Sequence, residues 1–216
     1  MKRAAVLLAM AVVAGSAVAQ TVGAPRSVRL APRDAWMREM EAGASITYHM
    51  PGLGDFDVFD KAVGVEFTYR YWFSDIFGIG AGLGFETWDV QRNNRNWVGE
   101  LDGDMMVIPL SVSGLLRIAD FEWGLLTGFV SVEYALCDSD ISMTRDGETQ
   151  GVGIDDSING RLGVELSVPV GDVLSLGVQV GYQGALMSGD ASAFGDPNME
   201  VDMQSVFVGL GASLAF

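Results

Sequence analysis

The sequence predicts an all-β fold, an eight-stranded antiparallel up-and-down transmembrane β-barrel preceded by a cleaved signal peptide. Apolar residues alternate with small or polar residues along about eight segments, and the last segment runs to Phe216. The connections between these segments are alternately long and short. A period of two is typical of β-strands. Eight is the smallest strand number usual in a closed barrel of the outer membrane.

Residues 1–19 have the pattern of a signal peptide. Lys2 and Arg3 form its basic start, and residues 4–14 form an apolar run. That run is shorter than the roughly 20 residues that a membrane-spanning helix needs. We therefore expect cleavage and export, and an uncleaved anchor is the alternative. The expected cleavage site consists of Ala17, Ala19 and Gln20.

The remaining chain is long enough for one sizeable domain. We expect a flexible periplasmic segment at residues 20–37 and the barrel at residues 38–216. The net charge of −15 becomes more negative once the signal peptide is removed. Nucleic acid is therefore excluded as a partner, because phosphate contacts need Lys and Arg. Cys137 is the single cysteine, so it cannot form an intramolecular disulfide, and we expect it to be inert.

The alternation in the expected strands separates two kinds of face. In residues 61–73, Val, Phe and Tyr occupy one face, and Gly, Glu, Thr and Arg occupy the other. In residues 77–88, Phe, Ile, Ala and Leu alternate with glycine. The remaining strands are expected near residues 39–49, 104–118, 122–136, 157–168, 173–187 and 202–216.

The expected connections are of two lengths. Outer-membrane barrels have short periplasmic turns and long extracellular loops, whereas a soluble sandwich has no reason for this asymmetry. The pattern therefore predicts a barrel in the outer membrane of a Gram-negative bacterium. The short turns are expected at residues 74–76, 118–120 and 169–172, and the long polar loops at residues 50–60, 91–104, 137–156 and 188–200.

The composition of the two faces predicts that the apolar row contacts lipid. The polar face is mostly small and uncharged, and Lys61 is the only lysine after the signal peptide. A surface in water would normally be charged and rich in Lys, whereas small residues suit a narrow lumen. A soluble lipocalin-like barrel is the alternative. Aromatic residues lie at strand ends, as in interfacial girdles: Tyr69, Tyr71, Phe73, Phe77, Trp88 and Phe216.

Two stretches resemble small outer-membrane barrels related to the OmpA transmembrane domain and OmpX. They are residues 70–88, RYWFSDIFGIGAGLGFETW, and residues 108–117, IPLSVSGLLR. The last strand, which ends in Phe216, also fits this group. The resemblance implies that Phe216 and Leu214 belong to a signal read by the barrel-assembly machinery. It further implies a monomer in outer-membrane lipid and lipopolysaccharide, without a cofactor and with a structural or surface-interaction role.

Charged residues on the polar face are expected to form an ion-pair network that plugs the lumen. Charges in a space with little water are costly unless they are paired. Counting across the hairpins places Glu41 near Arg70, and Glu133 near Arg161. A narrow conducting channel is the alternative, although about eight strands leave room only for side chains. The network consists of Glu41, Glu66, Arg70, Glu86, Glu133, Arg161 and Glu165.

Candidate chemistry is sparse, and we favour a non-enzymatic barrel. The metal and nucleotide motifs are absent from the sequence. His49, the only histidine, could be the base of a lipid A deacylase or acyltransferase if it lies at the extracellular rim beside Ser188 or Ser139.

Acidic loop residues could bind Ca²⁺ or a cationic partner at the cell surface. None of them matches the spacing of an EF-hand, and a solvated acidic surface is the alternative. These residues lie at 54–57, 138–140, 155–156, Asp196 and Glu200.

Overall fold

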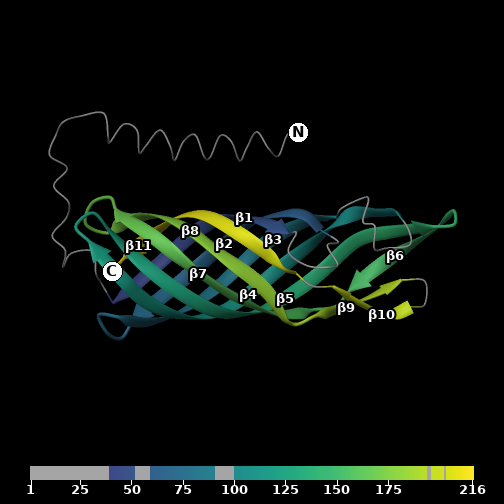
Figure 1. Cartoon of the computed structure of the whole chain (residues 1–216). Helices are drawn as coiled ribbons and strands as arrows, with labels where there is room; N and C mark the ends of the chain where they lie inside the picture. Colours follow the sequence, from purple (N-terminus) through teal and green to yellow (C-terminus); the bar gives the residue numbers. More distant parts are fainter. Residues whose placement is uncertain (1–38, 52–58, 91–99, 194–195, 202) are drawn as a thin grey trace, which may run out of the picture.

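The computed structural model describes residues 39–51, 59–90, 100–193, 196–201 and 203–216 (Figure 1). The expected signal peptide and the segment at residues 20–37 lie outside the described residues. The strands are β1 (Met40–Pro51), β2 (Phe59–Trp72), β3 (Phe77–Val90), β4 (Glu100–Phe121), β5 (Gly124–Arg145), β6 (Glu148–Ile154), β7 (Ser157–Pro169), β8 (Leu174–Met187), β9 (Gly189–Ala193), β10 (Asp196–Val201) and β11 (Ser205–Ala215).

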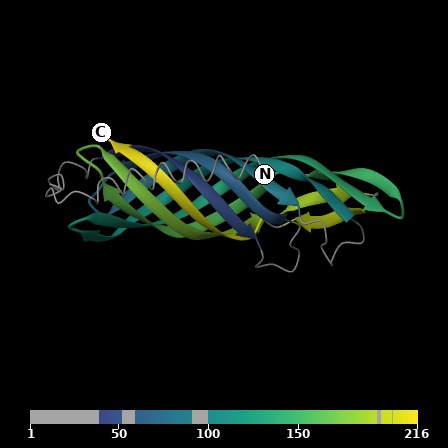
Figure 2. The ribbon, with the colours of Figure 1, turned by 90° about the horizontal axis from the view of Figure 1, so that it is seen from above.

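Eight of these strands form a closed antiparallel barrel in the order β1–β2–β3–β4–β5–β7–β8–β11. The strand β11 pairs with β1 from Ser205 opposite Pro51 to Ala215 opposite Glu41, which closes the barrel. The first part of β5 pairs with β7, and the part beyond it pairs with β6, so β6 is not one of the eight barrel strands. Figures 1 and 2 show the tilted strands of the barrel. The expected eight-stranded antiparallel barrel is therefore confirmed.

The outward face of the barrel is apolar and exposed. Phe67 is 52% exposed, Leu83 41% and Val112 68%, and their side chains alternate with buried or lumen-facing neighbours. Among the described residues no helix is long and apolar enough to cross a bilayer. A continuous apolar outer face of this extent is costly in water and favourable in lipid.

One end of the barrel, here called the turn end, carries the short turns and the end of β11 (Figure 1). Exposed aromatic residues gather there, as expected for an interfacial girdle, whereas Trp88, expected in the same girdle, is wholly buried. They include Tyr71, Phe73, Phe77, Trp123 and Phe216. The ring of Phe121 stacks on that of Trp123, with 5.4 Å between their centroids.

The expected turn at residues 118–120 is wrong. Strand β4 continues through these residues to Phe121, and the chain reverses at Glu122 and Trp123. A register shift between Arg117 and Ala119 absorbs one residue and allows the pairing with β5 to continue.

The expected loops at residues 137–156 and 188–200 are also wrong in part, because both contain strands. Strand β5 continues to Arg145 and returns as β6 through a two-residue turn, and β9 pairs with β10. Asp146 has a φ of 53° and Gly147 a φ of 85°. Positive φ at both positions is the requirement of a type I′ hairpin turn.

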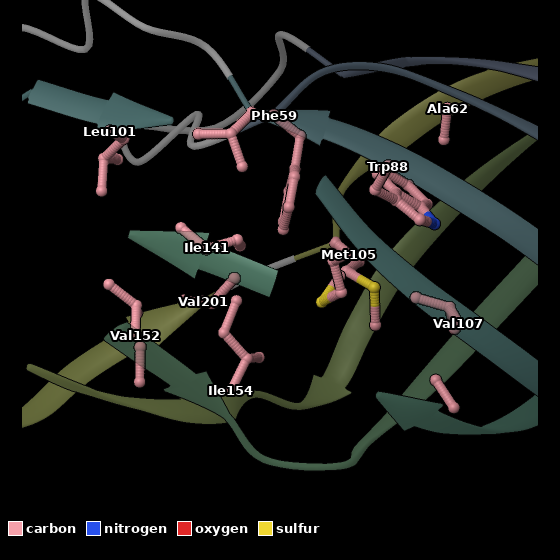
Figure 3. Close-up of a cluster of buried hydrophobic side chains, with 14 of the residues drawn as sticks. Phe59, Ala62, Trp88, Leu101, Met105, Val107, Ile141, Val152, Ile154 and Val201 are labelled. Atoms are coloured by element: carbon pink, nitrogen blue, oxygen red, sulfur yellow. The ribbon is translucent and has the colours of Figure 1, made fainter. Parts of the chain in front are cut away.

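These strands form an extension at the end opposite the turn end, here called the loop end (Figure 1). The loop-end sheet consists of residues 100–104, 138–154, 189–193 and 196–201. Its inner side and the adjoining lumen hold a buried apolar cluster, the loop-end cluster (Figure 3). The cluster consists of Phe59, Ala62, Trp88, Val90, Leu101, Met105, Val107, Ala135, Ile141, Met143, Val152, Ile154, Ala191, Val201 and Met203.

Candidate functional site

The lumen contains layers of paired polar side chains, and the layer nearest the turn end is built around Arg70. Its guanidinium donates two hydrogen bonds to Glu165, of 2.9 Å from Nη1 and 2.5 Å from Nη2. A bidentate pair of this kind is among the stronger hydrogen-bonded contacts in proteins. Glu41 Oε2 lies 3.8 Å from Arg70 Nη1. The indole of Trp72 donates to Glu41 Oε1 at 3.0 Å.

Arg117 contacts this layer through Trp72. Its guanidinium carbon lies 4.0 Å from the centre of the Trp72 ring, a cation–π geometry. Its Nη1 donates a hydrogen bond of 3.3 Å to the carbonyl oxygen of Asp75 in the β2–β3 turn. The indole therefore links the turn to the Arg70 layer.

A second layer lies around Arg161 on β7. Its Nη1 is 3.2 Å from Glu66 Oε2 and 3.2 Å from Glu133 Oε2, so two carboxylates share one guanidinium nitrogen. The amide of Asn159 donates to the other oxygen of Glu133 at 3.5 Å. The guanidinium also lies 4.5 Å above the ring of Phe207.

A third layer contains His49, whose two ring nitrogens face different partners. Nδ1 lies 3.1 Å from Ser205 Oγ, and Nε2 lies 3.3 Å from Glu86 Oε1. The other oxygen of Glu86 accepts a hydrogen bond of 2.9 Å from the indole of Trp88. Because Trp88 belongs to the loop-end cluster, this layer joins the polar lumen to the apolar cluster.

His49 lies near the loop end of β1, as expected, but its side chain faces the lumen and neither expected serine is its neighbour. His49 lies an even number of residues from Glu41 on the same strand, so both face the lumen. Its serine neighbour is Ser205 of β11. Ser139 instead donates its hydroxyl to the carbonyl of Val152 at 2.8 Å, in the loop-end sheet. Ser188 lies beyond the end of β8, between β8 and β9.

The serine, imidazole and carboxylate of this layer are the groups of a catalytic triad, but their setting differs from that of an active site. His49 and Ser205 are 0% exposed and Glu86 is 4% exposed. The imidazole is packed between Trp88 and Phe207, with ring centroids 5.2 and 5.5 Å away. The hydroxyl faces the filled lumen rather than lipid, so an acyl chain in the bilayer has no contact with it.

Aromatic rings fill the space between these layers where the strands carry glycine. Gly163 and Gly181 are direct neighbours on β7 and β8. Phe129 is the strand partner of the first, and Phe207 that of the second. A Cβ atom on Gly181 would lie 2.5 Å from the carbonyl oxygen of Leu162 and 2.5 Å from the Phe207 ring. Glycine is therefore required there by close packing.

Two small cavities remain on either side of Arg70. One has a volume of about 30 Å³ and the other about 40 Å³. Since one water needs roughly 10–15 Å³ by this measure, each cavity has room for about two or three waters. Hydroxyl and charged groups line much of both, including Thr68, Gln179, Ser111 and Ser131. Side chains thus occupy most of the described lumen around Arg70, and the two cavities there are small and polar.

The expected network residues therefore fall into separate layers. The structure places Glu41 and Glu165 at Arg70, and Glu66 and Glu133 at Arg161, whereas Glu86 contacts His49. The sequence analysis missed the residues that link these layers. Those residues are Ser205, Trp72, Trp88 and Arg117.

The acidic residues considered for Ca²⁺ do not form a metal centre in the part of the chain that the structure describes. Within those ranges no group of three or more His, Cys, Asp or Glu residues is arranged to hold a metal ion. Asp156 instead accepts hydrogen bonds from the hydroxyl of Tyr134 at 2.8 Å and the amide of Cys137 at 3.0 Å. Residues 54–57 lie outside the described ranges.

Comparison with known proteins supports the fold assignment. OprG from Pseudomonas aeruginosa, an outer-membrane protein, matches with a TM-score of 0.63 and 14% identity, over 84% of this chain and 98% of that one. A major outer-membrane protein from Thermus thermophilus matches with a TM-score of 0.50 and 14% identity, over 82% and 99%. No family model matches the sequence, and no curated protein matches it significantly. The closed barrel, its apolar outer face and these similarities give the chain the fold of small eight-stranded outer-membrane β-barrels.

Proposed function

We propose that the protein is a sealed, non-enzymatic barrel that anchors the loop-end sheet at the cell surface, where the sheet makes contacts that support envelope integrity. Two observations together support this proposal. Side chains fill the described lumen, and two strands extend beyond the end of the barrel. β4 and β5 are each 22 residues long and continue past the barrel to support β6, β9 and β10.

The side chains that fill the described part of the lumen favour an anchor over a channel. Arg70 and Arg161 each hold two carboxylates across the lumen. Breaking such a buried pair costs several kcal/mol, so thermal opening of a pore is disfavoured. Above these layers, the loop-end cluster fills the lumen with apolar side chains.

The outward side of the loop-end sheet and its base is acidic, which favours a cationic partner. Asp89, Asp104 and Asp140 are direct neighbours across β3, β4 and β5; Asp104 and Asp140 are exposed, and Asp89 is half-buried. Like charges opposite one another on a sheet are destabilising. Lys61 is 3.5 Å from Asp89, at one end of this row. A partner with several positive charges would relieve the remaining repulsion.

The position of His49 favours a non-enzymatic role over lipid A chemistry. Its layer is buried in the lumen and separated from the bilayer by the barrel wall. We place the barrel as a monomer in outer-membrane lipid, with the loop end toward lipopolysaccharide and the exterior. Phe216 and Leu214 end the outward row of β11 at the turn end, with exposed fractions of 51% each. This location is consistent with a role in assembly.

A shortened hairpin tests the proposal. Removing residues 142–145 and 148–151 joins Ile141 to Val152, which are already partners, through the existing turn at Asp146 and Gly147. The matched control carries Thr144→Ala and Thr149→Ala, which removes the hydrogen bond between the two hydroxyls but keeps the length.

We expect the shortened variant to reach the outer membrane as a heat-modifiable barrel, and cells that carry it to admit a dye that intact outer membranes exclude. The control and the native protein should exclude the dye, and neither should conduct ions in a planar bilayer. Full dye exclusion by cells with the shortened variant would contradict the role of the sheet. Steady conductance by the native protein would contradict the sealed lumen.

A further inference from the structure

The lumen layers toward the loop end contain more carboxylates than cationic groups. Near the turn end, Arg70 pairs with Glu41 and Glu165, and Arg117 lies near Glu41, Asp75 and Asp120. Toward the loop end, three carboxylates share one guanidinium and one imidazole. This group, here called the Arg161 cluster, consists of Glu66, Glu86, Glu133, Arg161 and His49.

The Arg161 cluster retains excess negative charge whichever form His49 takes. With a neutral imidazole the excess is two charges, and with an imidazolium it is one. Glu133 is 0% exposed, Glu86 4% and Arg161 3%. An uncompensated carboxylate in such surroundings is so costly that the group normally takes up a proton instead.

An unpaired acceptor next to Glu133 points to the same conclusion. The Oδ1 of Asn159 is buried and has no hydrogen-bond partner, and this residue is 0% exposed. Asn159 already contacts Glu133 through its amide nitrogen, at a long 3.5 Å. Rotation of that amide by half a turn would place Oδ1 at this position, ready to accept a hydrogen bond from a carboxyl O–H. The orientation of an amide is assigned from its contacts.

We infer that the Arg161 cluster is a buried proton-binding site, in which Glu133 keeps a proton at neutral pH. The proton forms a carboxylic acid that donates to Asn159, and it lowers the excess negative charge of the cluster by one. Glu133 is assigned the proton because it is the least exposed of the three carboxylates and lies beside the unpaired amide oxygen.

Each strand of the barrel contributes a side chain to the surroundings of Glu133. The titratable or charged groups that face the cluster are His49 on β1, Glu66 on β2, Glu86 on β3, Cys137 on β5 and Arg161 on β7. The uncharged polar groups are Ser111 on β4, Asn159 on β7, Gln183 on β8 and Ser205 on β11.

The site gives the stability of the barrel a characteristic dependence on pH. The unfolded chain releases the proton of a glutamate at a pH of about 4.3, whereas the folded barrel still holds it at neutral pH. Between these limits the folded state binds more protons, so the free energy of unfolding falls as the pH rises. A carboxylate held only by ion pairing, such as Glu165 with Arg70, gives the opposite sign, because its stabilisation is lost on acidification.

The experiment compares the native protein with Glu133→Gln and, as a matched control, Glu165→Gln. Each barrel is refolded into neutral phospholipid vesicles and unfolded in urea from about pH 5 to about pH 9. Over the pH range in which only the folded state holds the proton, the folding equilibrium constant falls by about tenfold for each unit of pH. We expect this dependence for the native protein and for Glu165→Gln, which should also be less stable throughout. Glu133→Gln should lose the dependence and be at least as stable as the native protein at the alkaline end.

Infrared spectroscopy of the native protein at neutral pH gives a second measurement that does not need a variant to fold. We expect the carbonyl stretching band of a protonated carboxylic acid, absent in Glu133→Gln and retained in Glu165→Gln. No such band at neutral pH would overturn the proposal. Stability that follows the concentration of Na⁺ or K⁺ rather than the pH would also overturn it, because a metal cation would then balance the charge.

Discussion

Replacing Leu83 by arginine tests whether the outer face of the barrel contacts lipid. Leu83 lies in the middle of β3 with its side chain outward and 41% exposed, between Phe67 on β2 and Leu110 on β4. Both neighbours are apolar and also exposed, so an arginine there has no carboxylate to pair with. In a bilayer its charge would lie in hydrocarbon.

The expected cost of Leu83→Arg is about 2–4 kcal/mol, the range for arginine on the lipid face near the bilayer midplane. With a urea dependence of about 2 kcal/mol per molar, the unfolding midpoint falls by about 1–2 M. If the outer face were in water, the same change on an exposed position would alter stability by no more than about 0.5 kcal/mol. The two environments therefore predict clearly different results.

Gly151→Arg is the matched control. Gly151 is exposed on β6, in the loop-end sheet, and an added Cβ there meets nothing within 4 Å. Both variants are unfolded in urea from phospholipid vesicles, with tryptophan fluorescence and the heat-dependent gel shift as readouts. A midpoint for Leu83→Arg equal to that of Gly151→Arg would refute the lipid-facing assignment.

Three further predictions concern other parts of the barrel. Deleting Phe216 should reduce the amount in the outer membrane, measured by immunoblot, far more than the stability of the refolded barrel, because its ring is half exposed; a normal membrane level would exclude an assembly role. Gly181→Ala should cost about 1–3 kcal/mol in urea unfolding, since the new Cβ would lie 2.5 Å from a backbone oxygen; unchanged stability would contradict this packing. Cys137 follows the last lipid-facing residue of β5, and burial, with the Asp156 carboxylate nearby, raises the pKa of its thiol to about 12. Its reaction with a water-soluble thiol reagent should therefore be slow and should still accelerate above about pH 9; a plateau near the ordinary thiol pKa would contradict it.

The faces of the strands could be predicted from the sequence because alternation is a local property. The outward row from Val65 to Phe73 and the inward position of Arg70 follow directly from it. The same reasoning extends to His49, since its separation from Glu41 is even. Its inward direction was therefore readable, whereas the sequence analysis gave weight to its place near the end of the strand.

The partners of those side chains could not be read in the same way. The contact between His49 and Ser205 depends on how β1 pairs with β11, and these strands are separated by most of the chain. The β5–β6 hairpin had a local signal, because an Asp-Gly pair at residues 146–147 is typical of a two-residue turn. Residues 137–156 were expected to be a loop because they are polar. They are polar because the outward side of this sheet lies beyond the band of lipid-facing residues.

The most direct test of a sealed barrel in lipid is the reactivity of single cysteines on its two faces. Leu83→Cys and Ser131→Cys are each made with Cys137→Ser and refolded into vesicles. Ser131 is buried at the lumen and 7% exposed, and cysteine differs from serine by one atom. We expect position 83 to react only with a lipid-confined thiol reagent and position 131 to react with neither that reagent nor a bulky water-soluble one. Aqueous labelling of position 131, with position 83 silent to the lipid-confined reagent, would contradict both the orientation of the wall and the closure of the lumen.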